Sequence, residues 1–167
     1  TEYKRCLIFH SLSKRSNVPG LRSGFVAGDS EMIESFYRYR TYHGCAMPLH
    51  VQKASIAAWD DEKHVKENRN IYRQKFLKVC SELESVLPVS PPPGGFYLWP
   101  KLPNSDVDFA KELYQSENVE VLPGSYLSRK IDNINPGSKR IRIALVAETD
   151  ACIEAAKRIK RFIENTH

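Results

Sequence analysis

Three residues near the start of the chain, Ser11, Lys14 and Arg22, could together bind a small molecule that carries an aldehyde and a phosphate. A lysine that directly follows an apolar strand can act as a nucleophile and condense with an aldehyde. A serine hydroxyl and a planar guanidinium both bind phosphate oxygens. Lys14 alone indicates little, because lysine is mostly a solvated surface residue. The joint presence of the three groups favours a cofactor site.

Arg142 is a fourth candidate, in a segment from 140 to 146 that first alternates basic and apolar residues and then becomes apolar. The alternation predicts a strand with Arg140 and Arg142 on the same face. Taken without further context, the pattern favours an edge strand whose charges are solvated.

The stretch SLSKRSNVPGLRSGFVAGD, residues 11–29, resembles the lysine signature of fold-type I aminotransferases that use pyridoxal 5′-phosphate (PLP). These enzymes form the class I/II group of the aspartate aminotransferase superfamily. The resemblance implies that Lys14 holds PLP as a Schiff base and shuttles a proton during catalysis. It also implies that Ser11 and Arg22 bind the cofactor phosphate, whereas Ser13 either contacts the cofactor or only packs.

Residues 15–25, 42–47 and 52–59 are similar to bacterial N-succinyldiaminopimelate aminotransferases. In the wider family, an arginine in a small-domain strand grips the substrate α-carboxylate, and Arg142 fits that pattern. A guanidinium suits this role because its fork pairs with both carboxylate oxygens. Many relatives have serine or asparagine two residues later, where this chain has Ala144.

The resemblance implies transfer of an amino group between glutamate or 2-oxoglutarate and another amino or keto acid. N-succinyl-L,L-diaminopimelate, in lysine biosynthesis, is the expected substrate. Three alternatives remain open: an aspartate or aromatic aminotransferase, a C–S lyase, and the PLP-sensing domain of a transcription regulator. The expected partners are therefore a small-molecule amino acid and a 2-oxo acid, with a homodimer for the full-length protein.

Tyr42 and His43 lie where relatives have a loop that reaches the neighbouring subunit, and packing or dimer contact is the favoured role. The resemblance covers only the later part of a family member. The chain also enters an apolar strand pattern almost at once, without a starting methionine. We therefore expect the C-terminal part of a longer protein, with little or no transaminase activity by itself.

The pattern of elements predicts an α/β protein. Apolar residues 6–9 predict a buried strand and residues 22–27 a second strand. Helices are expected over 31–39 with Ser30 as cap, over 51–59, and over 62–86 after Asp60 and Asp61. The later elements are strands near 96–99, 119–122 and 140–146, and helices over 107–116 and 149–164, capped by Asp106 and Thr149.

Four prolines between 88 and 93 indicate a boundary. We expect residues 1–60 to be a C-terminal remnant of the large PLP-binding domain. Residues 61–88 are expected to form a long connecting helix, and residues 89–167 a small α/β domain.

The composition, 41% hydrophobic and 27% charged, is that of a globular protein. The net charge is +5, and we expect its densest basic cluster, residues 157–161, to be a solvated helix face rather than a nucleic-acid site. We expect no membrane segment and no signal peptide. The four cysteines match neither a CxxC pair nor a zinc pattern. They predict reduced, mostly buried thiols in a cytoplasmic protein, without a bound metal.

Overall fold

The structure is a computed structural model that describes residues 3–166. The chain divides into two compact units, Thr1–Asn68 and Arg69–His167. Helix α4 (Lys63–Leu83) begins in the first unit and continues into the second. The domain roles expected for residues 1–60, 61–88 and 89–167 stay predictions.

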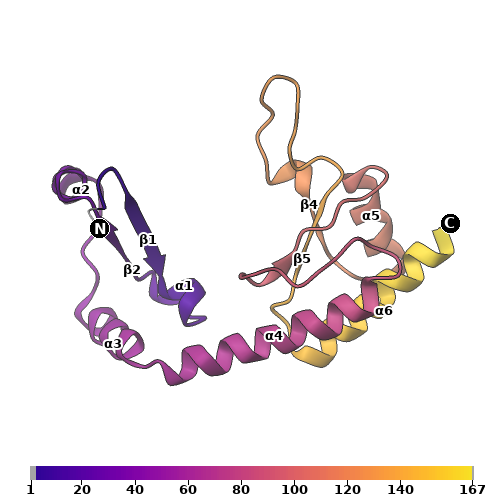
Figure 1. Ribbon diagram of the computed structural model, residues 1–167, viewed down its shortest axis with the longest axis horizontal. Helices are drawn as coiled ribbons and strands as arrows, with labels where there is room; N and C mark the ends of the chain where they lie inside the picture. The colour runs from indigo at the N-terminus through magenta and orange to yellow at the C-terminus, as the bar shows by residue number, and fades with distance from the viewer. Residues whose placement is uncertain (1–2, 167) are drawn as a thin grey trace. The chain divides into compact units, whose positions relative to one another are not determined.

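The first unit is built around a two-stranded antiparallel ribbon of β1 (Leu7–Ser11) and β2 (Gly24–Gly28), shown in Figure 1. The register places Ser11 opposite Gly24. The connection between the strands contains two short helical turns, α1 (Leu12–Arg15) and η1 (Pro19–Leu21). Two longer helices follow the ribbon, α2 (Ser30–His43) and α3 (Leu49–Asp60).

The prediction that the first strand is buried is wrong. Ile8 is 49% exposed and Phe9 is 66% exposed. A strand is covered on both faces only when other strands and helices surround it, and among the described residues β1 pairs only with β2. One edge-to-face aromatic contact, between Phe9 and Phe36 of α2, covers part of the ribbon.

The predicted helices are confirmed, but two of their caps lie one residue earlier than expected. Asp29 rather than Ser30 caps α2, because its Oδ1 accepts from the backbone N–H groups of Glu31 and Met32. Likewise, Ser105 caps α5 (Asp106–Glu117), and its Oγ accepts from the backbone N–H of Asp108. In both helices the predicted cap residue is the first residue of the helix itself. The residue before it provides the side-chain oxygen that accepts from the helix N-terminus.

The second unit has a three-stranded antiparallel sheet in the order β3-β5-β4. Its strands are β3 (Tyr97–Leu98), β4 (Leu122–Pro123) and β5 (Ile141–Ala144). A short turn, η2 (Gly124–Tyr126), follows β4, and the long helix α6 (Thr149–Thr166) follows β5. Helices α4 and α6 lie side by side in this unit (Figure 1), and Lys160 forms an ion pair with Glu82 between them.

A single apolar core fills the second unit. Helix α6 contributes Cys152, Ala156 and Ile159, whose spacing of four and three places them on one helix face. Ile159 and Leu113 of α5 are fully buried, and burial of such a side chain stabilises the fold by roughly 1.5–3 kcal/mol. The other core residues from α4 and the strands are Phe76, Val79, Cys80, Leu83, Leu98, Ile141 and Ile143.

The buried carboxylate of Asp106 fixes the long loop that connects β4 to β5. Its two oxygens accept from the backbone N–H groups of Ser125, at 2.8 Å, and Lys139, at 3.0 Å. The same loop needs glycine at position 124, because a Cβ there would lie 2.3 Å from the backbone oxygen of Gly137. Both ends of the loop are thereby held next to strand β5, which carries Arg142.

Only Cys80 and Cys152 are buried, whereas Cys6 and Cys45 are exposed, so the expectation of mostly buried thiols holds for two of the four. Within residues 3–166, no helix is long and apolar enough to cross a membrane. The same residues contain no cluster of three or more acidic, histidine or cysteine side chains placed to hold a metal ion.

Candidate active site

Ser11 is the last residue of β1 and the N-cap residue of α1. Its Oγ accepts from the backbone N–H of Ser13 and donates to the backbone oxygen of Ser23, both at 3.2 Å. The backbone N–H of Leu12 donates to the same Ser23 oxygen, and the Leu12 side chain is fully buried. These contacts cap the short helix α1 and attach its first residue to the start of β2. For Ser13, the structure shows a backbone contact to Ser11.

Lys14 lies in α1, just after the strand, and its side chain is exposed. Arg22 directly follows η1 in the left-handed conformation, with φ of 49°. Its Nη1 donates to the backbone oxygen of Pro19 at 2.8 Å. Because Ser11 pairs with Gly24, the residues after Ser11 and those before Gly24 lie at the same end of the ribbon. The structure therefore brings the backbone segments of all three predicted residues to one end of the ribbon.

A shallow hollow of about 450 Å³ lies beside the ribbon and includes Ser11 in its lining. The rest of its lining comes from β1, β2 and α2: Phe9, His10, Gly24, Phe25, Val26, Phe36 and Arg40. Lys14 and Arg22 do not line it. Of the three predicted cofactor residues, the hollow therefore includes Ser11 alone.

The residues that follow Lys14 are bound to the end of α3 and the start of α4. Arg15 is buried, and its guanidinium donates to the backbone oxygens of Ala58 and Trp59 and forms an ion pair with Glu62. The sequence analysis did not identify Arg15. The sequence shows a basic residue next to the lysine, but the partners of that residue lie more than 40 residues away along the chain, so no local pattern indicates them.

His64, in the first turn of α4, has two side-chain partners. Its Nδ1 lies 2.7 Å from Asp61 Oδ2, and its Nε2 lies 2.9 Å from Ser16 Oγ. The spacing of Asp61 and His64 at the start of a helix could have indicated the first contact. The second contact joins residues 48 positions apart and has no local signal.

Arg142 lies on β5, the central strand of its sheet, so the edge-strand interpretation is wrong. Its guanidinium carbon lies 5.4 Å from the centre of the Phe96 ring and 4.9 Å from that of Tyr97. Its Nε is buried and has no hydrogen-bond partner among the residues that the structure describes. A buried donor without a partner is costly, so this arginine is suited to binding an anion.

Tyr97 of β3 is 40% exposed. Alternation along β3 buries Leu98 and leaves Tyr97 on the face that contacts Arg142. Both aromatic rings therefore contact the candidate carboxylate-binding side chain.

Lys75 of α4, which the sequence analysis did not single out, fixes the backbone immediately after β5. It is buried, and its Nζ donates to the backbone oxygens of Leu145, at 3.3 Å, and Ala147, at 2.5 Å. The ammonium also lies 5.2 Å from the centre of the Tyr72 ring. This lysine thereby holds the chain that leads away from Arg142.

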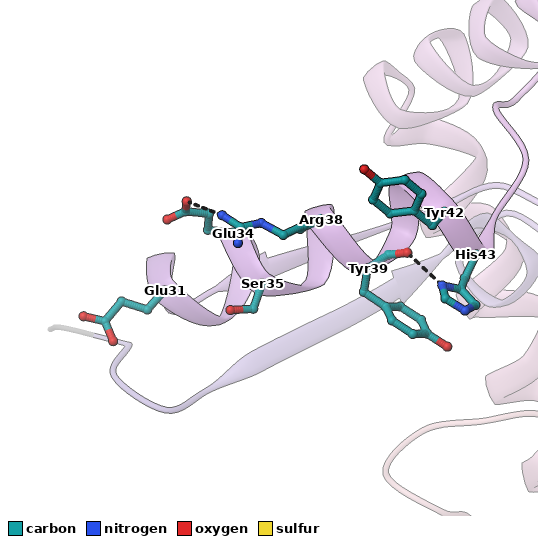
Figure 2. Close-up of a pocket in the computed structure, with 7 residues that line it drawn as sticks. All are labelled: Glu31, Glu34, Ser35, Arg38, Tyr39, Tyr42 and His43. Carbon is teal, nitrogen blue, oxygen red and sulfur yellow. Dashed lines mark hydrogen bonds and ion pairs between the residues drawn. The ribbon is translucent and has the colours of Figure 1, made fainter.

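A larger, open hollow of about 670 Å³ runs along α2, and Figure 2 shows that one helix supplies all its labelled side chains. Tyr42 and His43 lie in the last turn of α2, which continues beyond the helix expected over 31–39. Tyr42 is 82% exposed, and the His43 ring stacks on Tyr39 with a centroid distance of 4.2 Å. The role of these residues at a subunit contact stays a prediction.

The chain is similar to known proteins along nearly its whole length. Residues 1–159 match the family described as aminotransferase class I and II. An LL-diaminopimelate aminotransferase of Nitratidesulfovibrio vulgaris is 31% identical, with 90% of this chain and 39% of that protein covered. These matches confirm the family resemblance that the lysine signature indicated.

Two solved structures support the same assignment. A crystal structure of an aminotransferase from Neisseria meningitidis has a TM-score of 0.91 and 51% identity, covering 97% of this chain and 42% of that one. A protein described as a probable N-succinyldiaminopimelate aminotransferase from Thermus thermophilus has a TM-score of 0.83 and 29% identity, covering 95% and 42%.

The chain thus spans about two fifths of the length of the proteins that it matches. Its α/β elements are those of the corresponding part of aminotransferase chains, which confirms the predicted fold class. The signature around Lys14 and the match over residues 1–159 lead to one conclusion: this chain belongs to the class I and II aminotransferases, a family of transferases that generally depend on PLP.

Proposed function

We propose that the full-length protein is a PLP-dependent aminotransferase that transfers an amino group between glutamate or 2-oxoglutarate and another amino or keto acid. The observation that carries this proposal is the end of the β1–β2 ribbon, where the backbone segments that contain Ser11, Lys14 and Arg22 lie. It is supported by membership of a family whose members generally use PLP.

The donor set at this end of the ribbon fits the cofactor. An amine, a hydroxyl and a guanidinium match the aldehyde and the phosphate of PLP. A guanidinium has five N–H groups, and the Pro19 oxygen takes one from Arg22, so other donors remain for phosphate oxygens. Ser11 has a single hydroxyl proton, which it donates to Ser23. To donate to a phosphate, Ser11 must turn its hydroxyl away from Ser23.

PLP, when bound, supplies an aldehyde that condenses with an amine and a ring that withdraws electrons from the bond that breaks. In the proposed site, Lys14 Nζ provides the amine that holds the cofactor and later carries a proton to and from the substrate carbon. Arg22 and Ser11 neutralise and orient the phosphate. Ser13 contributes its backbone N–H to the cap that holds Ser11 in place.

Arg142 binds the α-carboxylate of the substrate in this proposal. Its guanidinium is held against the Phe96 and Tyr97 rings, and its buried Nε is a donor that a carboxylate oxygen would satisfy. Binding of both carboxylate oxygens fixes the orientation of the amino acid.

For the specific substrate, we propose N-succinyl-L,L-diaminopimelate, in lysine biosynthesis. The proposal is supported by the sequence resemblance around Lys14 and by similar proteins described as LL-diaminopimelate and N-succinyldiaminopimelate aminotransferases. We further propose that the full-length protein is a cytoplasmic homodimer. Kinetics of the full-length protein with N-succinylated, aspartate, aromatic and cystathionine-type donors would distinguish this substrate from the alternative aminotransferase and lyase activities.

Borohydride reduction of the full-length protein with PLP, followed by peptide mapping, tests the cofactor site. We expect a single stable label on Lys14, because reduction fixes the cofactor to the lysine that holds it. Lys14→Ala should abolish the label, whereas Lys53→Ala, at an exposed position on α3, should leave it unchanged. A label on any other lysine would overturn the site.

A further inference from the structure

We propose that residues 58–68, where α3 ends and α4 begins, position Lys14, and that His64 is the positioning residue that acts through Ser16. We call residues 58–68 the α3–α4 junction. The inference rests on the proposed function, because it concerns the lysine that is proposed to hold PLP. The atoms that carry it all lie within the first unit.

Helix α1 depends on contacts outside itself. It has four residues, and a single helical turn is unstable in isolation. Inside the turn, the backbone N–H of Ser16 donates to the oxygen of Leu12 at 2.9 Å, and Leu12 is buried. The direction in which Lys14 leaves the turn therefore depends on what binds the residues around it.

Arg15 attaches α1 to the end of α3. Its guanidinium binds the backbone oxygens of Ala58 and Trp59 and lies 4.9 Å from the centre of the Trp59 ring. The last carbonyl groups of a helix lack intrahelical donors, and they carry the negative end of the helix dipole. A buried guanidinium that also pairs with Glu62 is therefore a strong attachment at this point.

Asp61, His64 and Ser16 form a continuous chain of hydrogen bonds next to this attachment. The hydrogen bond from His64 and the backbone N–H of Lys63 lower the pKa of Asp61, so its carboxylate is an acceptor at neutral pH. Since a carboxylate only accepts, His64 Nδ1 donates to Asp61, and His64 Nε2 lies 2.9 Å from the Ser16 hydroxyl, within hydrogen-bond distance. The start of α4 is thereby bound to the residue two positions after Lys14.

Asn17 adds a third contact, since its Nδ2 donates to Asn68 Oδ1 at 3.0 Å. Three consecutive residues after Lys14 are thus bound to three successive parts of the α3–α4 junction. A lysine that only needed to reach solvent would not require this arrangement. A lysine that must meet a fixed aldehyde carbon does, because misplacement of a reacting group by about 1 Å can cost 10²-fold in rate.

The two contacts of His64 can be separated by substitution. The terminal amide of glutamine occupies nearly the position of Nε2, so His64→Gln keeps a partner for Ser16. The amide of asparagine occupies nearly the position of Nδ1, so His64→Asn keeps the contact with Asp61 and loses the contact with Ser16. Both variants have an uncharged amide at residue 64, which makes them a matched pair.

The experiment uses the full-length protein freed of PLP and measures how fast added PLP and borohydride label Lys14. We expect His64→Asn and Ser16→Ala to slow labelling by about three- to tenfold, the effect of one lost hydrogen bond. His64→Gln should label at nearly the wild-type rate. His50→Asn, at an exposed site on α3, is the control and should also match wild type.

Steady-state kinetics provide a second readout. His64→Asn should lower kcat by a similar factor and leave KM for the amino donor within about twofold, because the substrate-binding residues are unchanged. Ser16→Ala removes the contact with His64 and also a 3.5 Å contact with Arg15 Nη1. In the double variant His64→Asn with Ser16→Ala, the loss should therefore not exceed that of Ser16→Ala alone.

The outcomes separate this inference from the proposed function. A wild-type label on another lysine would overturn both. A wild-type label on Lys14 together with an unchanged labelling rate in His64→Asn would overturn the inference alone. Equal losses in His64→Gln and His64→Asn would also overturn it, since they would indicate a general packing role for the histidine.

Discussion

The guanidinium carbon of Arg142 lies 4.9 Å from the centre of the Tyr97 ring, across the β3–β5 strand pair. The register pairs Tyr97 with Ala144, so the two side chains are diagonal neighbours on one face of the sheet. Phe96 contacts the same guanidinium, while Lys75 binds the backbone that follows the strand. Arg142 is therefore held in place by its ring contacts and by a fixed strand.

Replacement of Arg142 tests whether it binds the substrate carboxylate. Arg142→Lys keeps the charge but loses the planar fork, so we expect KM for the amino donor in the full-length protein to rise about tenfold. Arg142→Met should lower kcat/KM by about 100-fold or more, because a charge-assisted pair is lost. Arg140→Lys is the control, since Arg140 binds the Trp99 backbone oxygen. Equal KM values for wild type and Arg142→Met would contradict the role.

Replacement of Tyr97 tests whether the ring orients Arg142. Tyr97→Leu removes the aromatic face and should raise KM for the amino donor by about twofold to thirtyfold, corresponding to a cation–π contact of about 0.5–2 kcal/mol. Tyr97→Phe keeps the face and should bind the donor nearly as well as wild type. A large loss in Tyr97→Phe would instead indicate that the phenol hydroxyl, rather than the ring, is the important group.

Asp106 should make the stability of the second unit depend on pH. Burial raises the pKa of this carboxyl, but the hydrogen bonds from Ser125 and Lys139 outweigh burial and hold the pKa below its ordinary value of 3.8. Because the folded pKa lies below the unfolded one, the carboxylate stabilises the fold above about pH 4. This contribution is lost as the pH falls through the folded pKa.

We therefore expect Asp106→Asn to lower the free energy of unfolding by about 1–3 kcal/mol at pH 7 and by less as the pH falls below about 4. Urea unfolding followed by Trp99 fluorescence in a Trp59→Phe background would measure this. Asp108→Asn, in the same first turn of α5 but exposed, is the control for the lost helix-terminal charge. A constant difference between Asp106→Asn and wild type from pH 7 to pH 2.5 would contradict the prediction.

Local patterns in the sequence predicted the order of helices and strands well. The periodicity of α4 and α6, the alternation in β5 and the lysine signature are all properties of short windows. Cap positions were less predictable, because Asp29 and Ser30, or Ser105 and Asp106, are adjacent residues that can all accept from a helix N-terminus. The choice between them depends on backbone geometry at the helix start.

The sequence by itself determined the family, the element order and the residue types at the proposed PLP site. Only the tertiary structure decided that β5 is a central strand, that Arg142 contacts two aromatic rings, and that His64 binds Ser16 across 48 residues. The physical reason is that spacing along the chain informs only about neighbours within a turn or a strand. Contacts between distant elements form when their apolar faces pack, and no local pattern encodes that packing.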